Sequence, residues 1–111
     1  TSFYLLAWGV PTFDALYTLQ ALIRSKGEGA DGSFNYGNYS HPRIDAIIDG
    51  VKSELDLTKR RNMMIEALRL HNEDVGNIPI HHQMIPWAMA SNVTVAHQAE
   101  NQLDVKWAKV D

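Results

Sequence analysis

Histidines are the first candidates for chemistry in this sequence. His81 and His82 are adjacent, and His71 precedes His81 by ten residues. A metal site or a histidine-dependent hydrolase would use such rings as ligands or as a general base. In a strand, however, neighbouring side chains point to opposite faces, so His81 and His82 cannot share one metal ion without distortion. We interpret these histidines as surface or hydrogen-bonded structural residues, with a histidine-dependent hydrolase as an alternative.

Three glycines have the spacing of a dinucleotide-binding loop: Gly27, Gly29 and Gly32. That mechanism needs the glycines to follow a strand and to open a helix, so that phosphate meets the helix N-terminus. Here they follow a predicted helix and stand in a stretch from 26 to 41 that is rich in turn-forming residues. We interpret this stretch as a long loop, and loops of this length are usually functional or mobile.

Other catalytic signals are missing from the sequence. It has no Gly-x-Ser-x-Gly elbow and no cysteine, which excludes disulfides and thiolate chemistry. Asp45 and Asp49 are four residues apart on a predicted helix, a spacing typical of a solvated face. We therefore predict no catalytic residue, no metal ligand and no cofactor.

Trp8 is the strongest candidate for ligand contact. It stands at the end of an apolar run and is followed by Gly9, Pro11 and a helix start. In open α/β sheets, ligands bind in the crevice beyond the strand ends. A plain core position for Trp8 is an equally good interpretation, because tryptophan is usually well buried.

Composition limits the remaining function classes. The formal net charge is -3 and the hydrophobic fraction is 45%, as in an ordinary globular protein without a basic footprint for nucleic acid. No apolar run approaches the roughly 20 residues of a membrane-spanning helix. Nucleic acid is therefore not expected as a partner.

The elements that would position these residues are organised around one helix that leads into a strand. Asp56 or Thr58 can cap the helix, and Gly76 is its expected stop. From residue 78 to residue 84, apolar and polar residues alternate, which predicts a strand buried on one side. The apolar or small residues of the helix recur on one face, at Leu57, Met64, Ala67, Leu68, His71 and Val75.

The other elements follow from the same patterns. We expect further strands at 3–8, near 93–96 and near 103–108, with a turn from Gln98 to Gln102. Two more helices are predicted, one capped by Thr12 or Asp14 and running to about Arg24, the other from about Pro42 to Leu55. The prediction is an α/β fold of about three helices packed on a mixed sheet, with residues 1–111 as a single domain.

The abrupt start of the chain favours a fragment. Thr1 and Ser2 lead at once into the predicted strand at 3–8, whereas free termini are usually poorly ordered. We expect the chain to be cut from a longer protein, with a complete small protein as the alternative.

Four stretches resemble a known family: FYLLAWGVPTFD from Phe3, NYGNYSHPRIDAIID from Asn35, DLTKRR from Asp56 and NIPIHHQ from Asn77. Their order and spacing resemble the C-terminal part of the family 5 extracellular solute-binding proteins, the peptide-binding components of bacterial ABC importers. The resemblance covers nearly the whole chain.

This resemblance implies part of the C-terminal lobe of a two-lobed, non-enzymatic, periplasmic receptor. Such a receptor closes over a peptide or a related small solute and delivers it to an ABC permease in the membrane. It implies ligand-binding residues in two loops, at Trp8, Gly9, Pro11, Asp14, Asn35, Tyr36 and Asn38.

One departure from the family leaves the ligand open. Peptide-binding members can carry an aspartate that pairs with the peptide's amino group in the loop after the tryptophan. This sequence has Pro11 three residues after Trp8, and Asp14 matches a later aspartate. Peptides, nickel complexes, glutathione and opines are therefore all candidate ligands. The alternative from another class is a structural interaction module, with a homodimer formed through apolar surface that the cut lobe would expose.

Overall fold

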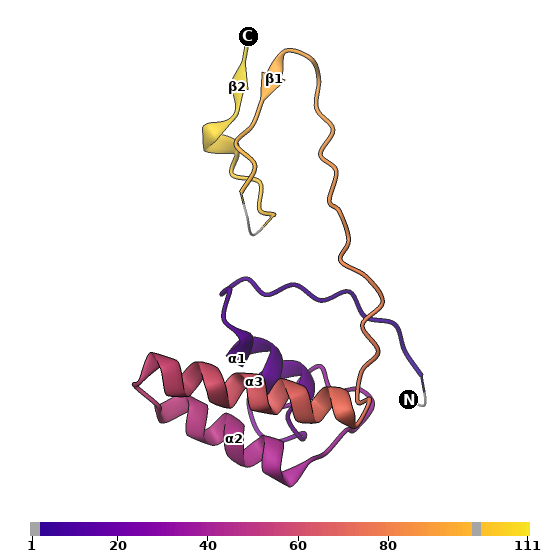
Figure 1. The fold of residues 1–111 in the computed structure, drawn as a ribbon. Coiled ribbons are helices and arrows are strands. Elements are labelled where there is room, and N and C mark those ends of the chain that lie inside the picture. Colours follow the sequence, from indigo (N-terminus) through magenta and orange to yellow (C-terminus); the bar gives the residue numbers. More distant parts are fainter. Residues whose placement is uncertain (1–2, 99–100) are drawn as a thin grey trace. The chain divides into compact units, whose positions relative to one another are not determined.

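The computed structural model describes residues 3–98 and 101–111. The chain divides into two compact units, Thr1–Ile78 and Pro79–Asp111, and the first contains all three α-helices (Figure 1). The prediction that all residues belong to one domain of a larger lobe stays a prediction. Residues 99 and 100 of the expected turn at Gln98–Gln102 lie outside the described residues.

The first helical segment begins where the sequence predicts. The carboxylate of Asp14 accepts a hydrogen bond from the backbone N–H of Leu16 at 2.8 Å, which satisfies a donor that the helix start leaves free. The short helix α1 (Ala15–Thr18) then widens into the π-helical segment η1 (Leu19–Ile23). This segment ends before Arg24, close to the predicted boundary.

The second helix, α2 (Pro42–Ser53), starts at Pro42 and ends at Ser53 rather than at Leu55. Proline suits this position because the first helical N–H has no partner within the helix. The ring of His41 provides the cap, since Nδ1 accepts a hydrogen bond from the N–H of Ile44 at 3.3 Å.

The third helix, α3 (Leu57–Glu73), is capped by Asp56, whose Oδ1 accepts from the N–H of Lys59 at 2.8 Å. It ends at Glu73 rather than at the expected stop, Gly76. Val75, rather than Gly76, takes the left-handed conformation that often follows a helix end, with φ of 54°. Two residues of the predicted apolar face, Leu57 and Val75, are exposed.

The three helices pack against one another. The cluster at their centre is fully or almost fully buried and consists of Leu19, Ile23, Ile44, Ile48 and Ala67. Burying an aliphatic side chain of this size stabilises the folded state by about 1.5–3 kcal/mol. Because the apolar stripes of the helices cover one another, this core does not need a sheet.

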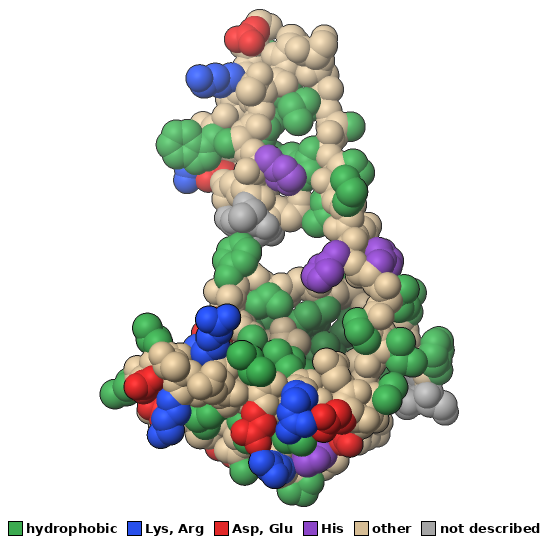
Figure 2. Space-filling view, in the orientation of Figure 1, with side chains coloured by type: hydrophobic (Ala, Val, Ile, Leu, Met, Phe, Trp, Pro, Cys, Tyr) green, Lys and Arg blue, Asp and Glu red, His purple; other side chains and the backbone are tan. Residues whose placement is uncertain are grey.

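The loop from 26 to 41 is confirmed as a loop, because no helix or strand lies between η1 and α2. Arg24 fixes it in place: Nε contacts Asp31 at 2.8 Å, and the guanidinium makes paired bonds to Asp49 at 2.7 and 3.1 Å. Lys52 lies 3.3 Å from Asp31. Acidic and basic side chains accordingly lie side by side over the first compact unit, which contains the α-helices and is called the helical unit below (Figure 2).

The second unit contains one small sheet. Strand β1 (Val93–Thr94) pairs antiparallel with β2 (Lys109–Val110), with Val93 opposite Val110. A single 3₁₀ turn, η2 (Val105–Trp107), precedes β2 and is capped by Asp104.

The predicted mixed sheet is wrong for the described residues. Segments 3–8 and 78–84 form no strand, and most of their large apolar side chains are exposed. The alternating pattern was real, but a strand also needs a hydrogen-bonded neighbour, and neither segment has one among the described residues. At 103–108 the chain forms η2 instead, and the strand near 93–96 is confirmed only over Val93–Thr94.

The α/β class is confirmed in its coarse form, as three α-helices and a two-stranded antiparallel sheet. None of the helices in the described part of the chain combines the length and the apolar composition that crossing a bilayer requires.

Candidate functional site

The candidate site is built around Trp8, which is half-buried. Its indole N–H donates a hydrogen bond to the hydroxyl of Thr18 at 2.9 Å. Its ring stacks on Tyr17, with centroids 5.4 Å apart and an interplanar angle of 19°. Buried indole N–H groups normally find such a partner. Helix α1 therefore fixes both the position and the orientation of the Trp8 ring through Thr18 and Tyr17.

The ring of Trp8 is part of a larger aromatic cluster, which consists of Tyr4, Trp8, Tyr17, Phe34 and Tyr36. Phe34 packs edge to face against two rings, with a centroid distance of 5.3 Å to Trp8 and of 6.3 Å to Tyr36. Tyr4 meets Tyr36 edge to face at 5.6 Å. Edge-to-face pairs at these distances are favourable beyond simple burial. The cluster thus joins the N-terminal segment, α1 and the loop.

A hollow of about 260 Å³ lies beside this cluster and shares Tyr17 with it. Polar oxygen and amide groups and one aliphatic side chain complete its lining, from Thr12, Asp14, Leu16 and Gln20. An aromatic wall next to a few polar groups is a common lining for small-molecule sites.

Asp14 lies at this hollow with its carboxylate already partnered. Besides capping α1, it contacts Nη2 of Arg60 at 2.7 Å. The backbone N–H of Leu16, and after it the Arg60 guanidinium, keep the pKa of Asp14 below its ordinary value despite an opposing effect of burial. The carboxylate is therefore charged at neutral pH and held by two donors.

Gly9 and Pro11 lie in the exposed connection between Trp8 and α1. No atom lies within 4 Å of the position that a Cβ on Gly9 would take. Pro11 stands in a turn closed by a bond from the N–H of Phe13 to the carbonyl of Val10 at 3.2 Å. Both residues border open space next to Trp8.

Asn35 does not face this surface. It is only 2% exposed, and its amide nitrogen donates to the carbonyls of Arg24 and Tyr39 at 2.9 and 2.7 Å. Its Oδ1 accepts from the N–H of Tyr39 at 3.0 Å. These three bonds use the side chain to close the loop.

Tyr36 and Asn38 are both exposed. Tyr36 belongs to the aromatic cluster, whereas Asn38 occupies a left-handed turn position with φ of 55°, a role for which asparagine is suited. Of the residues predicted from the sequence, the structure therefore brings Trp8 and Tyr36 into one cluster and places Gly9, Pro11 and Asp14 beside it.

Sequence reasoning missed Tyr4, Tyr17, Phe34 and the hollow. Tyr17 lies on α1, and neither it nor Phe34 nor Tyr4 belongs to a recognisable motif. The one available signal was the density of aromatic residues in the loop and the N-terminal segment.

His71 belongs to the first compact unit, whereas His81 and His82 belong to the second. His71 is buried in α3, and His81 and His82 are exposed in the second unit. Within the described ranges, no group of three or more His, Cys, Asp or Glu side chains could hold a metal ion. In the same residues, no histidine ring is hydrogen-bonded to a serine or threonine hydroxyl, the pair that nucleophilic catalysis uses. The hydrolase alternative stays a hypothesis.

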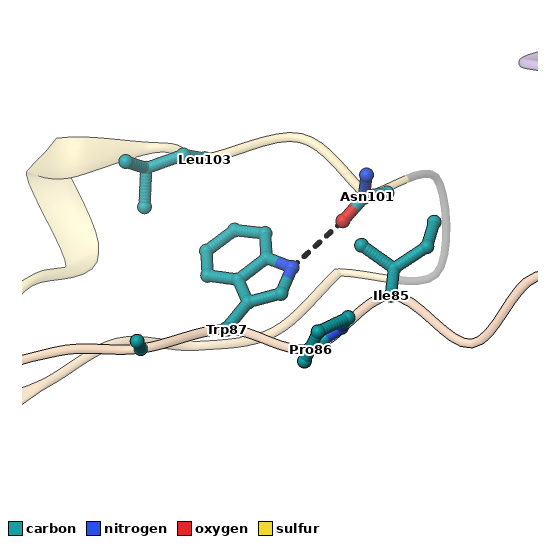
Figure 3. A pocket seen from close by; sticks show the side chains of 6 residues that line it. Ile85, Pro86, Trp87, Asn101 and Leu103 are labelled. Carbon is teal, nitrogen blue, oxygen red and sulfur yellow. Dashed lines mark hydrogen bonds between the residues drawn. The ribbon is translucent and has the colours of Figure 1, made fainter.

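The second unit has a shallow apolar hollow of about 340 Å³ around Trp87 (Figure 3). The indole N–H of Trp87 donates to Oδ1 of Asn101 at 2.7 Å. The remaining lining is apolar, from Ile85, Pro86, Ala88 and Leu103. Because Asn101 is the only polar side chain in this lining besides the indole, the hollow offers fewer polar groups than the surface around Trp8.

Tyr39 ties the end of the loop to the end of α3. Its hydroxyl donates to Oδ2 of Asp74 at 2.7 Å. Burial, and after it the hydrogen bond to Asp74, raise the pKa of Tyr39 well above its ordinary value. In the unfolded chain the hydroxyl ionises near pH 10. The stabilisation by Tyr39 is therefore present below about pH 10 and lost as the pH rises above it.

Replacing Tyr39 with phenylalanine is expected to lower the free energy of unfolding by about 1 kcal/mol at about pH 8, because one hydrogen bond to a charged partner is lost. Urea unfolding at about pH 10.5 should show a smaller difference between the two proteins, since only the unmodified chain has the Tyr39 hydroxyl, whose stabilising effect is lost there. If the difference in the free energy of unfolding were the same at both pH values, the Tyr39 hydroxyl would not stabilise the fold as proposed.

Comparison of the chain with protein-family models, curated proteins and solved structures gives no match.

Proposed function

We propose that this chain is part of the solute-binding component of a bacterial ABC importer and contributes one wall of a peptide site. The full receptor would act in the periplasm and deliver a peptide or related small solute to its permease. The proposal takes the chain as a piece of the C-terminal lobe and assigns it no catalytic role. The family resemblance of the four sequence stretches suggests the class.

The observation that carries the proposal is the aromatic cluster beside a polar hollow. Trp8 and Tyr17 form a stacked pair, and the hollow that contains Tyr17 also offers the oxygens of Thr12 and Asp14. Aromatic walls with a few placed polar groups suit extended peptides, whose side chains vary while the backbone stays the same.

The segment that leads into Trp8 adds backbone groups to this surface. From Phe3 to Gly9, the backbone makes no hydrogen bond to any other described residue. Free N–H and C=O groups along an extended segment can bond the backbone of an extended peptide. Side-chain contact with the aromatic cluster and backbone contact with this segment would then support the same ligand.

The test uses the whole protein encoded by the gene that contains these residues. We expect calorimetric titration with mixtures of short peptides to give a dissociation constant at or below about 1 µM. Trp8→Ala should weaken binding about tenfold or more, because it removes the centre of the aromatic wall. The isolated 111-residue chain should bind weakly, since it lacks the other side of the cleft.

Thr18→Val is the matched control. It removes the hydroxyl that accepts from the Trp8 indole at 2.9 Å but leaves the ring, and we expect affinity within about threefold of the unmodified protein. Equal losses for both variants would contradict a direct role for the ring. A coding sequence that starts immediately before Thr1, or a chain that dimerises and binds no peptide or related solute, would favour the interaction module instead.

A further inference from the structure

His71 is a buried, ionisable residue at the end of α3. Only 4% of it is exposed. Its Nε2 lies 2.9 Å from Oδ1 of Asn77, and since that oxygen only accepts, Nε2 carries the proton. The rings of His71 and Tyr39 pack edge to face, with centroids 4.8 Å apart. The ring is thus held on two sides.

The other ring nitrogen has no partner. Nδ1 of His71 is buried without a hydrogen bond. A Cβ on Gly76 would lie 2.7 Å from Nδ1 and 2.3 Å from Cε1, so the backbone of Gly76 closes this side of the ring. A second proton on the imidazole would sit on Nδ1 and would find no acceptor there, which costs free energy in a buried position.

The surrounding charges do not remove this cost. Asp74, from the turn after α3, favours the protonated ring, but its carboxylate is bonded to the hydroxyl of Tyr39 at 2.7 Å and lies 3.7 Å from Nε2 of His41. Burial outweighs the hydrogen bond to Asn77 and the charge of Asp74, and it lowers the pKa of His71. The proton is therefore taken up more readily when the ring becomes exposed to water.

The turn that covers His71 is also strained. Val75 has φ of 54°, which is unfavourable for a β-branched residue. The same turn leads directly to Ile78, the last residue of the first compact unit. We propose that protonation of His71 opens the 74–78 turn and makes the junction before Pro79 sensitive to mild acid. Stability of the closed turn is present above the ordinary histidine pKa and is lost as the pH falls below it.

Amide hydrogen exchange of the full chain, corrected for the intrinsic effect of pH, tests this inference. Between about pH 7.5 and about pH 5, exchange at the hydrogen-bonded amides of residues 74–76 is expected to rise about tenfold or more. Amides in the middle of α3, from 63 to 68, should keep their protection. In His71→Gln, whose amide nitrogen can replace Nε2 but does not titrate, the increase should disappear.

Two controls separate this switch from other causes. His41→Asn removes the other histidine of this region while keeping a helix-capping residue, and it should leave the increase unchanged. Ring NMR of the unmodified chain should give His71 a midpoint that coincides with the shift of the Gly76 amide. The inference is overturned if His71→Gln responds like the unmodified chain, if His41→Asn abolishes the response, or if α3 loses protection together with the turn.

Discussion

Gly32→Ala is expected to destabilise the first compact unit strongly, with a loss of about 3–5 kcal/mol in the free energy of unfolding. Gly32 is buried and has φ of 61°. An added Cβ would lie 2.7 Å from the carbonyl oxygen of Arg24 and 2.8 Å from the Cα of Lys26. These are backbone atoms, so no side-chain rotation can relieve the contact.

Gly29→Ala provides a control for the conformational part of this effect. Gly29 has nearly the same φ, 64°, but nothing lies within 4 Å of its Cβ position. It should therefore cost only about 1 kcal/mol, the penalty for a left-handed alanine. Urea unfolding followed by far-UV circular dichroism measures both variants, because the α-helices all lie in the first unit. Equal losses in the free energy of unfolding for the two variants would show that backbone atoms do not crowd the Cβ position of Gly32.

The helices were predictable because local chemistry decides them. Asp14 and Asp56 were each one of two caps predicted from the sequence, and Pro42 was predicted as a helix start. Each of the three satisfies or removes a free N–H at a helix start. The end of α3 was not predictable in the same way. Gly76 was the expected stop of the helix, but its role is to leave room for the His71 ring. That requirement comes from packing and has no local signal.

The strand predictions were wrong because strands depend on contacts that are distant in the sequence. Alternation at 78–84 indicates which residues could share a face, but strand pairing depends on a neighbour that can lie anywhere in the sequence. In the second unit, the cap at Asp104 favours a 3₁₀ turn and shifts the strand to Lys109–Val110. A pattern of apolar residues cannot indicate such a shift.

The candidate site was partly predictable. Trp8 could be predicted because its residue type and its place before a turn suggest a ligand surface. Its stacking on Tyr17 could not be predicted, because that contact depends on how the chain returns over α1. Asn35 shows the limit of carrying a role over from a family resemblance. Its residue type suits both ligand binding and loop closure, and only its burial and its three bonds distinguish the two.

Asn35→Ala is accordingly expected to destabilise the helical unit by about 3 kcal/mol, because it leaves the N–H of Tyr39 and two carbonyls without partners. These are the carbonyls of Arg24 and Tyr39, which the amide now bonds at 2.9 and 2.7 Å. Loss of the closing bonds would also free Tyr39 from its position beside α3. Urea unfolding near neutral pH measures the change.

Two further variants separate hydrogen bonding from the other effects of Asn35→Ala. Asn35→Asp keeps the shape but turns an oxygen toward the two carbonyls, so it should cost at least as much as alanine although it leaves no cavity. Asn38→Gly changes the same residue type in the same loop at an exposed position with φ of 55°, and glycine tolerates that conformation. It should lie within about 0.5 kcal/mol of the unmodified chain. If Asn35→Asp were neutral, the three bonds would not hold the loop, and Asn35 would again be a candidate for ligand contact.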